Sequence, residues 1–268
     1  MITYFIYEQV LMGTHLWQNF LIDTKVQSYI ADKISKIYKK NNLEAIIEIG
    51  PGKWAITKKI YQISNNFCVI EKDPTMKEHL DKILSKEQIN FADVLEENIE
   101  NKLKNINPKK TLIVGNLPYY ITSPIFRKFF GNGKQEFFGG FFMIQDEVGE
   151  KIKTDSKKKS FLWWLVNYAY DIIYWKTVWA KSFNPAPKVK SCLVEFRIKT
   201  EKIGLDFDKL LEFLDLYAPF SRKTLWAIEK ILIKQNKKTF SIPEDLKKHR
   251  LEELNWNNLK NIINKSHN

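Results

Sequence analysis

The strongest constraint on the fold of this chain is an alternation, between residues 43 and 144, of short apolar runs with segments of helical spacing. Such an alternation is typical of a parallel α/β sheet, in which each strand is followed by a crossover helix. The apolar runs predict strands at residues 43–49, 67–70, 89–92, 111–114 and 137–144. Helical spacing predicts helices at residues 55–63, 74–84 and 124–130.

The stretch that follows has a different pattern. The polar and basic residues 151–160 predict an exposed connection, and residues 161–169 predict a helix. Two β-rich runs, at residues 172–178 and 191–198, flank a proline-rich loop at residues 183–188. These runs extend the β-rich part of the chain well beyond residue 144.

A change of pattern near residue 200 predicts a domain boundary. After Thr200 the spacing is helical to the end, and Pro243-Glu244-Asp245 predicts a helix start. A chain of 268 residues also exceeds one typical domain. We therefore expect a large α/β domain at residues 1–199 and a small all-helical domain at residues 200–268.

Composition restricts the class of protein. The 44% of hydrophobic residues suffices for a core, and no apolar run is long enough to cross a membrane. The first ten residues contain Glu8 and lack the basic start and the small-residue cleavage site of a signal peptide. Cys68 and Cys192 lie inside strand-like runs, so we expect reduced core thiols rather than a disulfide or a metal site. These features predict a cytoplasmic protein.

The charge balance favours a polyanionic partner. Lysine and arginine number 43 against 31 acidic residues, a net charge of +12, and phosphate contacts dominate the affinity of proteins for nucleic acids. A lysine-rich proteome would give the same surplus, because only four of the 43 basic residues are arginine. Charge alone therefore leaves both interpretations open.

A glycine loop and two acidic residues stand at the ends of predicted strands. Glycine in the loop at residues 48–52 (EIGPG) lets the backbone turn sharply and approach a ligand closely. Glu71 ends the next strand at the spacing from which a carboxylate can accept hydrogen bonds from ribose hydroxyls, and Asp93 ends the third strand. Singly, each acid would be interpreted as a solvated loop residue. Together they outline a nucleoside pocket, a layout that dinucleotide and adenosylmethionine sites share.

The tetrad Asn116-Leu117-Pro118-Tyr119 distinguishes these two kinds of site. It follows the fourth predicted strand, at the edge where such folds place their chemistry. Methylation of an adenine amino group needs acceptors that draw its hydrogens out of the ring plane, and the Asn116 oxygen and the Pro118 carbonyl can serve. Tyr119 offers a face on which an extruded base can stack. This chemistry requires no metal. The alternative interpretation is an ordinary turn, because asparagine and proline are common turn residues.

Six motifs in this order resemble the ribosomal RNA adenine dimethyltransferase family, from about residue 13 to the C-terminus. They are residues 18–23 (QNFLID), 48–52 (EIGPG), 116–120 (NLPYY), 145–148 (QDEV), 183–189 (FNPAPKV) and 222–225 (RKTL). The resemblance implies a Rossmann-like class I methyltransferase sheet with a helical RNA-binding C-terminal domain. It implies transfer of methyl groups from S-adenosylmethionine to N6 of two adjacent adenosines near the 3′ end of small-subunit rRNA, during ribosome maturation.

The resemblance also implies roles for individual residues. The catalytic residues would be Asn116, Leu117, Pro118 and Tyr119. Tyr119 and Phe183 would stack on the target adenine, while Arg222, Lys223 and the lysines at residues 157–159 would contact RNA phosphates. The partner would be small-subunit rRNA within a pre-ribosomal particle, and we expect a monomer without metal or membrane association. The cofactor would be held by Asn19, Leu21, Gly50, Gly52, Glu71, Asp93 and Asn116.

Tryptophan occupies positions where the family has small residues, most often glycine. These positions are Trp17, Trp54, one of Trp163 and Trp164, and Trp179. The ten glycines are about half the usual share, and ten glycines with eight tryptophans restore it. One hypothesis is that several of these tryptophans are UGA codons that the source lineage translates as glycine; the alternative is divergence with compensating repacking. Glycine at position 54 would let the helix pack against the strand, and overpacking such a site costs about 1–3 kcal/mol.

Two other functions remain open. A related methylase modifies one adenosine of large-subunit rRNA and shares the tetrad, but Leu117, Tyr119-Tyr120 and the motifs at residues 183–189 and 222–225 favour the dimethyltransferase. A non-catalytic nucleic-acid-binding relative is disfavoured by intact Asn116, Glu71 and Asp93. The basic motif near Phe220 is shorter than in the family and lacks one expected arginine, which weakens the prediction of RNA contacts there.

Overall fold

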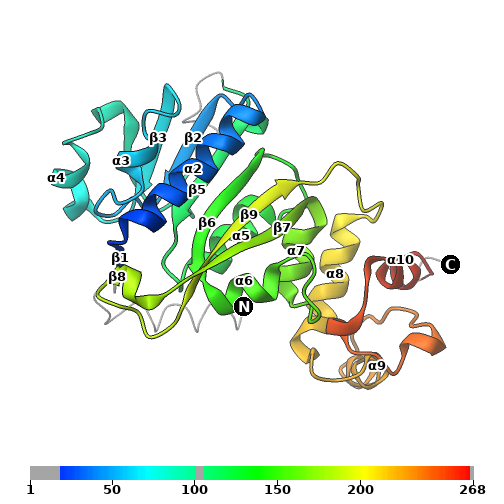
Figure 1. The fold of residues 1–268 in the computed structure, drawn as a ribbon. Coiled ribbons are helices and arrows are strands. Elements are labelled where there is room, and N and C mark those ends of the chain that lie inside the picture. Colours follow the sequence, from blue (N-terminus) through cyan, green and yellow to red (C-terminus); the bar gives the residue numbers. More distant parts are fainter. Residues whose placement is uncertain (1–18, 100–105, 266–268) are drawn as a thin grey trace.

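The computed structural model describes residues 19–99 and 106–265, and among them a seven-stranded sheet forms the centre of the molecule (Figure 1). Its strand order is β4-β3-β2-β5-β6-β9-β7. The first five strands in this order are parallel, and β9 is antiparallel to both of its neighbours. The strands are β2 (Ala45–Ile49), β3 (Asn66–Glu71), β4 (Ile89–Phe91), β5 (Thr111–Asn116), β6 (Gly139–Gln145), β7 (Tyr170–Val178) and β9 (Ser191–Ile198).

All seven strand predictions are confirmed, because each predicted run contains or overlaps the strand observed there. The apolar runs of β2 and β5 are buried on both faces of the sheet, as expected for central parallel strands. Residues of these strands alternate between two cores. Ile47 and Ile113 contribute to one core, and Ile46 and Leu112 contribute to the other.

Helices cover both faces of the sheet (Figure 1). On one face, α5 (Thr122–Phe130), α6 (Asp146–Ile152) and α7 (Phe161–Ala169) supply residues to the first core. On the other face, α2 (Thr24–Lys40), α3 (Thr57–Ile60) and α4 (Lys77–Leu80) pack against the second. The helix predicted at residues 161–169 is confirmed, and α5 begins two residues before its predicted start.

Two of the predicted helices are shorter than expected. The segment 55–63 forms only the single turn of α3, and the segment 74–84 forms a 3₁₀ turn at Pro74–Met76 followed by the single turn of α4. Three residues before α3, Trp54 has a left-handed backbone with φ 58°, so a regular helix cannot extend back through it. The sequence analysis did not predict α2, although Asp23 caps its N-terminus by accepting hydrogen bonds from Lys25 N and Val26 N.

The C-terminal residues form a third core of their own. It joins α8 (Phe207–Tyr217), α9 (Leu225–Lys234) and α10 (Trp256–Lys265) with three residues of α7, Trp163 to Leu165. Helix α7 therefore packs against the sheet core with one side and the C-terminal core with the other. The prediction of helix to the end is wrong for residues 235–255, where only two 3₁₀ turns occur, Glu244–Leu246 and Leu251–Glu253. Pro243 begins the first of these turns instead of an α-helix.

A small second sheet lies beside the carboxyl edge of the central one. It pairs β1 (Phe20–Leu21) with β8 (Phe183–Asn184) in antiparallel register, with Leu21 opposite Phe183. The segment 183–188 was expected to be a loop, and its first two residues are this strand. In the connection predicted at residues 151–160, α6 continues to Ile152 before the exposed part begins. None of the described helices is both long and apolar enough to span a membrane.

Candidate active site

The strand order places the predicted residues at one point of the sheet. The chain runs outward from β2 to β4 and then returns to β5 on the other side of β2, so the topology switches direction between β2 and β5. Ligands of open α/β sheets bind beyond the carboxyl ends of the strands at such a point. Ile49 lies opposite Gly115 in the register of these two strands, so the glycine loop and Asn116 leave the sheet side by side.

The glycine loop holds the Glu71 carboxylate in place. Gly50 and Gly52 have φ values of 66° and 52°, which glycine adopts without strain. The backbone N–H of Gly52 donates to Oε2 of Glu71 at 3.0 Å, and that of Asp73 donates to Oε1 at 2.9 Å. Burial raises the pKa of Glu71 although these bonds act in the opposite direction. A carboxylate has about four acceptor positions, so each oxygen of Glu71 keeps capacity for a ligand hydroxyl.

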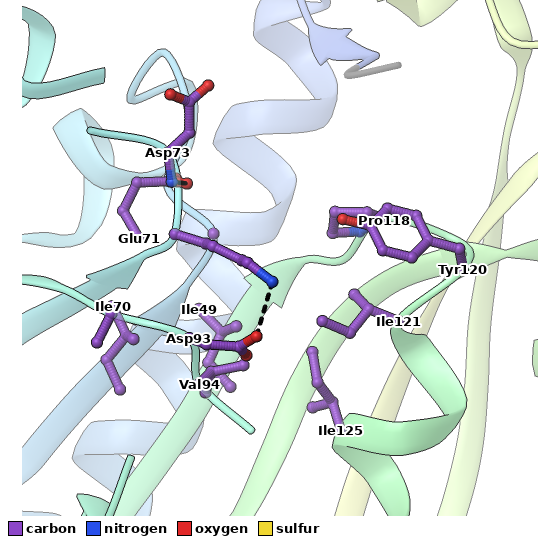
Figure 2. A pocket seen from close by; sticks show the side chains of 13 residues that line it. Ile49, Ile70, Glu71, Asp73, Asp93, Val94, Pro118, Tyr120, Ile121 and Ile125 are labelled. Atoms are coloured by element: carbon purple, nitrogen blue, oxygen red, sulfur yellow. Dashed lines mark hydrogen bonds and ion pairs between the residues drawn. The ribbon is translucent and has the colours of Figure 1, made fainter. Parts of the chain in front are cut away.

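Asp93 lies at the end of β4, next to Glu71. Its Oδ2 accepts a hydrogen bond from Lys72 Nζ at 2.7 Å, and its Oδ1 accepts one from Leu95 N at 2.9 Å. Burial raises the pKa of Asp93, but these two bonds, with the positive charges of Lys72 and Lys128, outweigh burial and hold the pKa below its usual value. Figure 2 shows Ile49, Ile70 and Val94 around Asp93, and Tyr120 across the cavity.

The tetrad turns away from β5 as a tight corner. Leu117 N donates to Met143 O at 3.0 Å, which ties the corner to β6. The Pro118 carbonyl accepts two hydrogen bonds, from Ile121 N and from Thr122 Oγ1, both at 3.1 Å. A carbonyl oxygen has two lone pairs, and in this turn both face donors of the Pro118 corner itself, whereas the sequence predicts that this carbonyl accepts from an adenine amino group. Within the part of the chain that the structure describes, the Leu117 carbonyl accepts no hydrogen bond.

Tyr119 is tied to the neighbouring loop by its hydroxyl, which lies 2.8 Å from the Ser191 hydroxyl. Ser191 is buried at the start of β9, directly after the loop that carries Phe183. Phe183 is buried as well, and β8 holds it against Leu21. The two aromatic residues predicted to stack on a base therefore line the same cavity, although they lie on different elements.

Two adjoining cavities bring the predicted cofactor residues together. The first has a volume of about 60 Å³, and its lining includes Gly50, Glu71 and Asp93. The second has a volume of about 300 Å³ and shares Gly50, Glu71 and Pro118 with the first. Predicted residues in the lining of the second cavity are Asn19, Leu21, Gly50, Gly52, Glu71, Asn116, Leu117, Pro118, Tyr119 and Phe183.

The predicted RNA-contact residues lie elsewhere. Arg222 and Lys223 are exposed between α8 and α9, in the C-terminal core region, and line neither cavity. Lys157 and Lys158 are exposed after α6, whereas Lys159 is half-buried with its ammonium over the Trp163 ring. No group of three histidine, cysteine or acidic residues among residues 19–99 and 106–265 could hold a metal ion.

The lining also includes residues to which the sequence assigned no role, among them Phe20, Lys72 and Tyr120. Sequence reasoning also gave no role to Glu48, whose carboxyl is fully buried in β2 and lines the larger cavity. Burial raises the pKa of Glu48 to about 8, and the nearby negative charge of Glu71 acts in the same direction. The signal was present in the sequence, since Glu48 interrupts an otherwise apolar strand.

Trp54 departs from the expectation of overpacking. Its side chain is half-buried, belongs to neither sheet core and packs edge-on against His79, with ring centroids 5.6 Å apart. The cost at this position lies in the backbone instead, because φ 58° is a conformation that glycine adopts freely and other residues adopt with strain. Trp164 is buried with no hydrogen-bond partner for Nε1, Trp179 is exposed in extended backbone, and Trp17 lies outside the described residues.

Comparisons with known proteins identify the family. A family model described as ribosomal RNA adenine dimethylase matches residues 12–265. The ribosomal RNA small subunit methyltransferase A of Mycoplasmopsis pulmonis is 36% identical over 214 residues, which cover 78% of this chain and 79% of that protein. The protein of the same name from Hydrogenobaculum sp. is 30% identical over 249 residues, which cover 92% of this chain and 90% of that protein.

Two solved structures share the fold. The 23S rRNA methyltransferase ErmE superposes with a TM-score of 0.66 at 19% identity, covering 93% of this chain and all of the other. A dimethyladenosine transferase from Plasmodium falciparum superposes with a TM-score of 0.62 at 23% identity, covering 85% of this chain and 92% of the other. At sequence identities this low, the two structures show only that this chain shares their fold.

Proposed function

Because this chain belongs to the ribosomal RNA adenine dimethylase family, we propose that it transfers methyl groups from S-adenosylmethionine to N6 of two adjacent adenosines near the 3′ end of small-subunit rRNA. The observation that carries the proposal is the convergence of Glu71, Asn116 and Tyr119 on two adjoining cavities at the switch point of the sheet. The family motifs alone would support only the fold, and function has to be argued from the arrangement of the residues in the site.

The residues present fit an adenosylmethionine. The Glu71 carboxylate, fixed by two backbone N–H groups, suits the two ribose hydroxyls, and Asp93 suits the amino edge of an adenine. Gly50 and Gly52 allow the backbone to approach the rest of the cofactor, and Asn19 and Leu21 line the same larger cavity. When bound, the cofactor supplies a methyl group on a positively charged sulfur.

The tetrad prepares the acceptor. The Asn116 side-chain oxygen and the Leu117 carbonyl, which replaces the Pro118 carbonyl in this role, accept hydrogen bonds from the adenine amino group. These bonds localise the nitrogen lone pair for attack. Tyr119 and Phe183 hold the extruded base between their rings, which fixes the distance and direction of approach. Leu117 contributes through its backbone, while its buried side chain anchors the corner in the first core.

We place RNA recognition outside the cavities. Residues 200–268 form the proposed helical RNA-binding domain beside the catalytic residues 1–199, and its exposed Arg222 and Lys223 contact phosphates. The lysines at residues 157–159 extend this basic surface. The substrate is small-subunit rRNA within a pre-ribosomal particle in the cytoplasm, and the enzyme acts as a monomer.

The test uses the full chain with undermethylated small and large ribosomal subunits and labelled adenosylmethionine, followed by nucleoside analysis. Label recovered as N6,N6-dimethyladenosine from small-subunit rRNA supports the proposal. Label confined to large-subunit rRNA would assign the chain to the single-adenosine methylases. The absence of label from both, with RNA binding retained, would identify a non-catalytic relative.

A further inference from the structure

A lysine lies between the two acids of the proposed cofactor site. Lys72 follows Glu71 directly at the end of β3, and its ammonium donates to Oδ2 of Asp93 at 2.7 Å. The Lys72 side chain is 55% exposed, whereas that of Asp93 is 19% exposed. The ion pair therefore joins a largely solvated cation to a carboxylate that faces the cavity, as the dashed line at Asp93 in Figure 2 shows.

The chemistry of this pair opposes an adenine at the same place. An adenine amino group can only donate to Asp93, and a lysine ammonium is also only a donor. Both groups therefore draw on the lone pairs of the same carboxylate, and the ammonium bound at Oδ2 leaves less room there for the amino group. The other oxygen, Oδ1, already accepts from Leu95 N.

The volumes of the two cavities agree with competition between Lys72 and an adenine at Asp93. The cavity that Lys72 lines is about 60 Å³, a fifth of the roughly 300 Å³ of its neighbour, with which it shares Glu71. Tyr120 lies across the small cavity from Asp93 (Figure 2), so the adenine end of the site is narrow on that side as well. Lys72 is the member of this lining best able to leave, because more than half of its side chain already faces solvent.

We propose that Lys72 gates the adenine end of the cofactor pocket: its ion pair with Asp93 must open before the adenosine of the cofactor can bind. This inference rests on the proposed function for the identity of the cofactor. Exposed lysine–carboxylate pairs are weak, so the gate lowers affinity modestly and does not block binding. Salt screens such a pair, and the cost of opening it therefore falls as ionic strength rises.

The test measures binding of S-adenosylhomocysteine to the full chain by calorimetry, without any turnover. Lys72→Met keeps an unbranched side chain that is shorter by one atom and removes the charge. We expect it to bind the ligand about two- to fivefold more tightly than the unaltered protein. The unaltered protein should bind more tightly as salt increases, whereas Lys72→Met should lose most of this dependence.

The matched control is Lys77→Met. It removes the same charge from an exposed lysine–aspartate pair, Lys77 with Asp81 in and after α4, outside both cavities. It should leave affinity and its salt dependence unchanged. The gate would be overturned if Lys72→Met bound the ligand no more tightly than the unaltered protein, or if Lys77→Met gained as much affinity as Lys72→Met. It would also be overturned if neither the unaltered protein nor Lys72→Met bound the ligand. Tighter binding by Lys72→Met in a chain that forms no dimethyladenosine would uphold the gate and reject the proposed function.

Discussion

The hydroxyl of Tyr119 lies 2.8 Å from the hydroxyl of Ser191, and this contact links the tetrad after β5 to the loop that carries Phe183. The contact spans 72 residues of sequence. Tyr119 lines the larger cavity, and Ser191 is buried at the start of β9. The bond therefore fixes the spacing of the two aromatic faces between which we place the target base.

Removal of this bond should slow methyl transfer without weakening cofactor binding. Ser191→Ala and Tyr119→Phe each delete one hydroxyl, and we expect each to lower kcat on small subunits about three- to tenfold, the value of one hydrogen bond. The double variant should be no slower than either single variant, because both changes remove the same interaction. Additive losses, measured as initial rates at saturating adenosylmethionine, would show that the two residues act separately.

The backbone of Trp54 yields a prediction on stability. Trp54→Ala removes the contact with His79 but keeps a Cβ at φ 58°, whereas Trp54→Gly removes both. We expect the glycine variant to be about 1 kcal/mol more stable to urea than the alanine variant, since a left-handed conformation costs other residues about 1–2 kcal/mol. At ordinary helical positions the order is the reverse. An alanine variant at least as stable as the glycine variant would contradict a left-handed backbone at this residue.

The gene provides a separate test of the codon hypothesis. Glycine is favoured at position 54 by its backbone, and tryptophan is costly at position 164, where a buried indole N–H has no partner. Trp179 is exposed and has an ordinary extended backbone, so the structure favours neither residue there. UGA at codons 17, 54 and 179 is the expected result. UGG at these codons would show that the tryptophans are genuine.

The buried Glu48 predicts a dependence of stability on pH. Burial raises its pKa to about 8, so near neutral pH this carboxyl is protonated in the folded chain and ionised in the unfolded one. Stability is then fully present below the ordinary pKa of glutamate and is lost as the pH rises toward about 8. The loss is at most about 1.4 kcal/mol per pH unit.

Glu48→Gln should flatten this dependence, because it keeps the shape and removes the titrating group. The measurement is the free energy of unfolding in urea at a series of pH values from acid to mildly alkaline. Glu44→Gln, which alters an exposed glutamate just before β2, is the matched control and should keep the slope of the unaltered protein. An unchanged slope in Glu48→Gln would mean that the Glu48 carboxylate is ionised in the folded chain.

The parts of the site that could be predicted from sequence are those that local patterns determine. The strand runs predict β2, β3 and β5, and topology then brings their carboxyl ends, with Gly50, Glu71 and Asn116, to one edge. The Phe183 loop was assigned to the site by family resemblance alone, because its pairing with Leu21 joins segments far apart in the chain.

Contacts that depend on the folded geometry could not be predicted in the same way. The Pro118 carbonyl is occupied by Ile121 and Thr122 within its own turn, which a motif of residue types does not reveal. The pairing of Lys72 with Asp93 requires the adjacency of β3 and β4 as well as a side-chain direction. The left-handed backbone of Trp54, three residues before α3, is likewise a property of the folded chain, and apolar spacing carries no information on it.

Asn116 gives the most direct test of the catalytic assignment. It ends β5 at the mouth of the larger cavity, and its side-chain oxygen is the acceptor that we place on the adenine amino group. Asn116→Ala should lower methyl transfer by at least about a hundredfold, because the amino nitrogen is then no longer held in line with the methyl group. Binding of small subunits should remain nearly unchanged, since the proposed phosphate contacts at Arg222 and Lys223 lie outside the cavity.

Arg222→Ala should show the opposite pattern, with weaker subunit binding and an unaltered rate at saturating subunits. Equal loss of binding and transfer in Asn116→Ala would mean that Asn116 positions the RNA as a whole and not the reacting amino group.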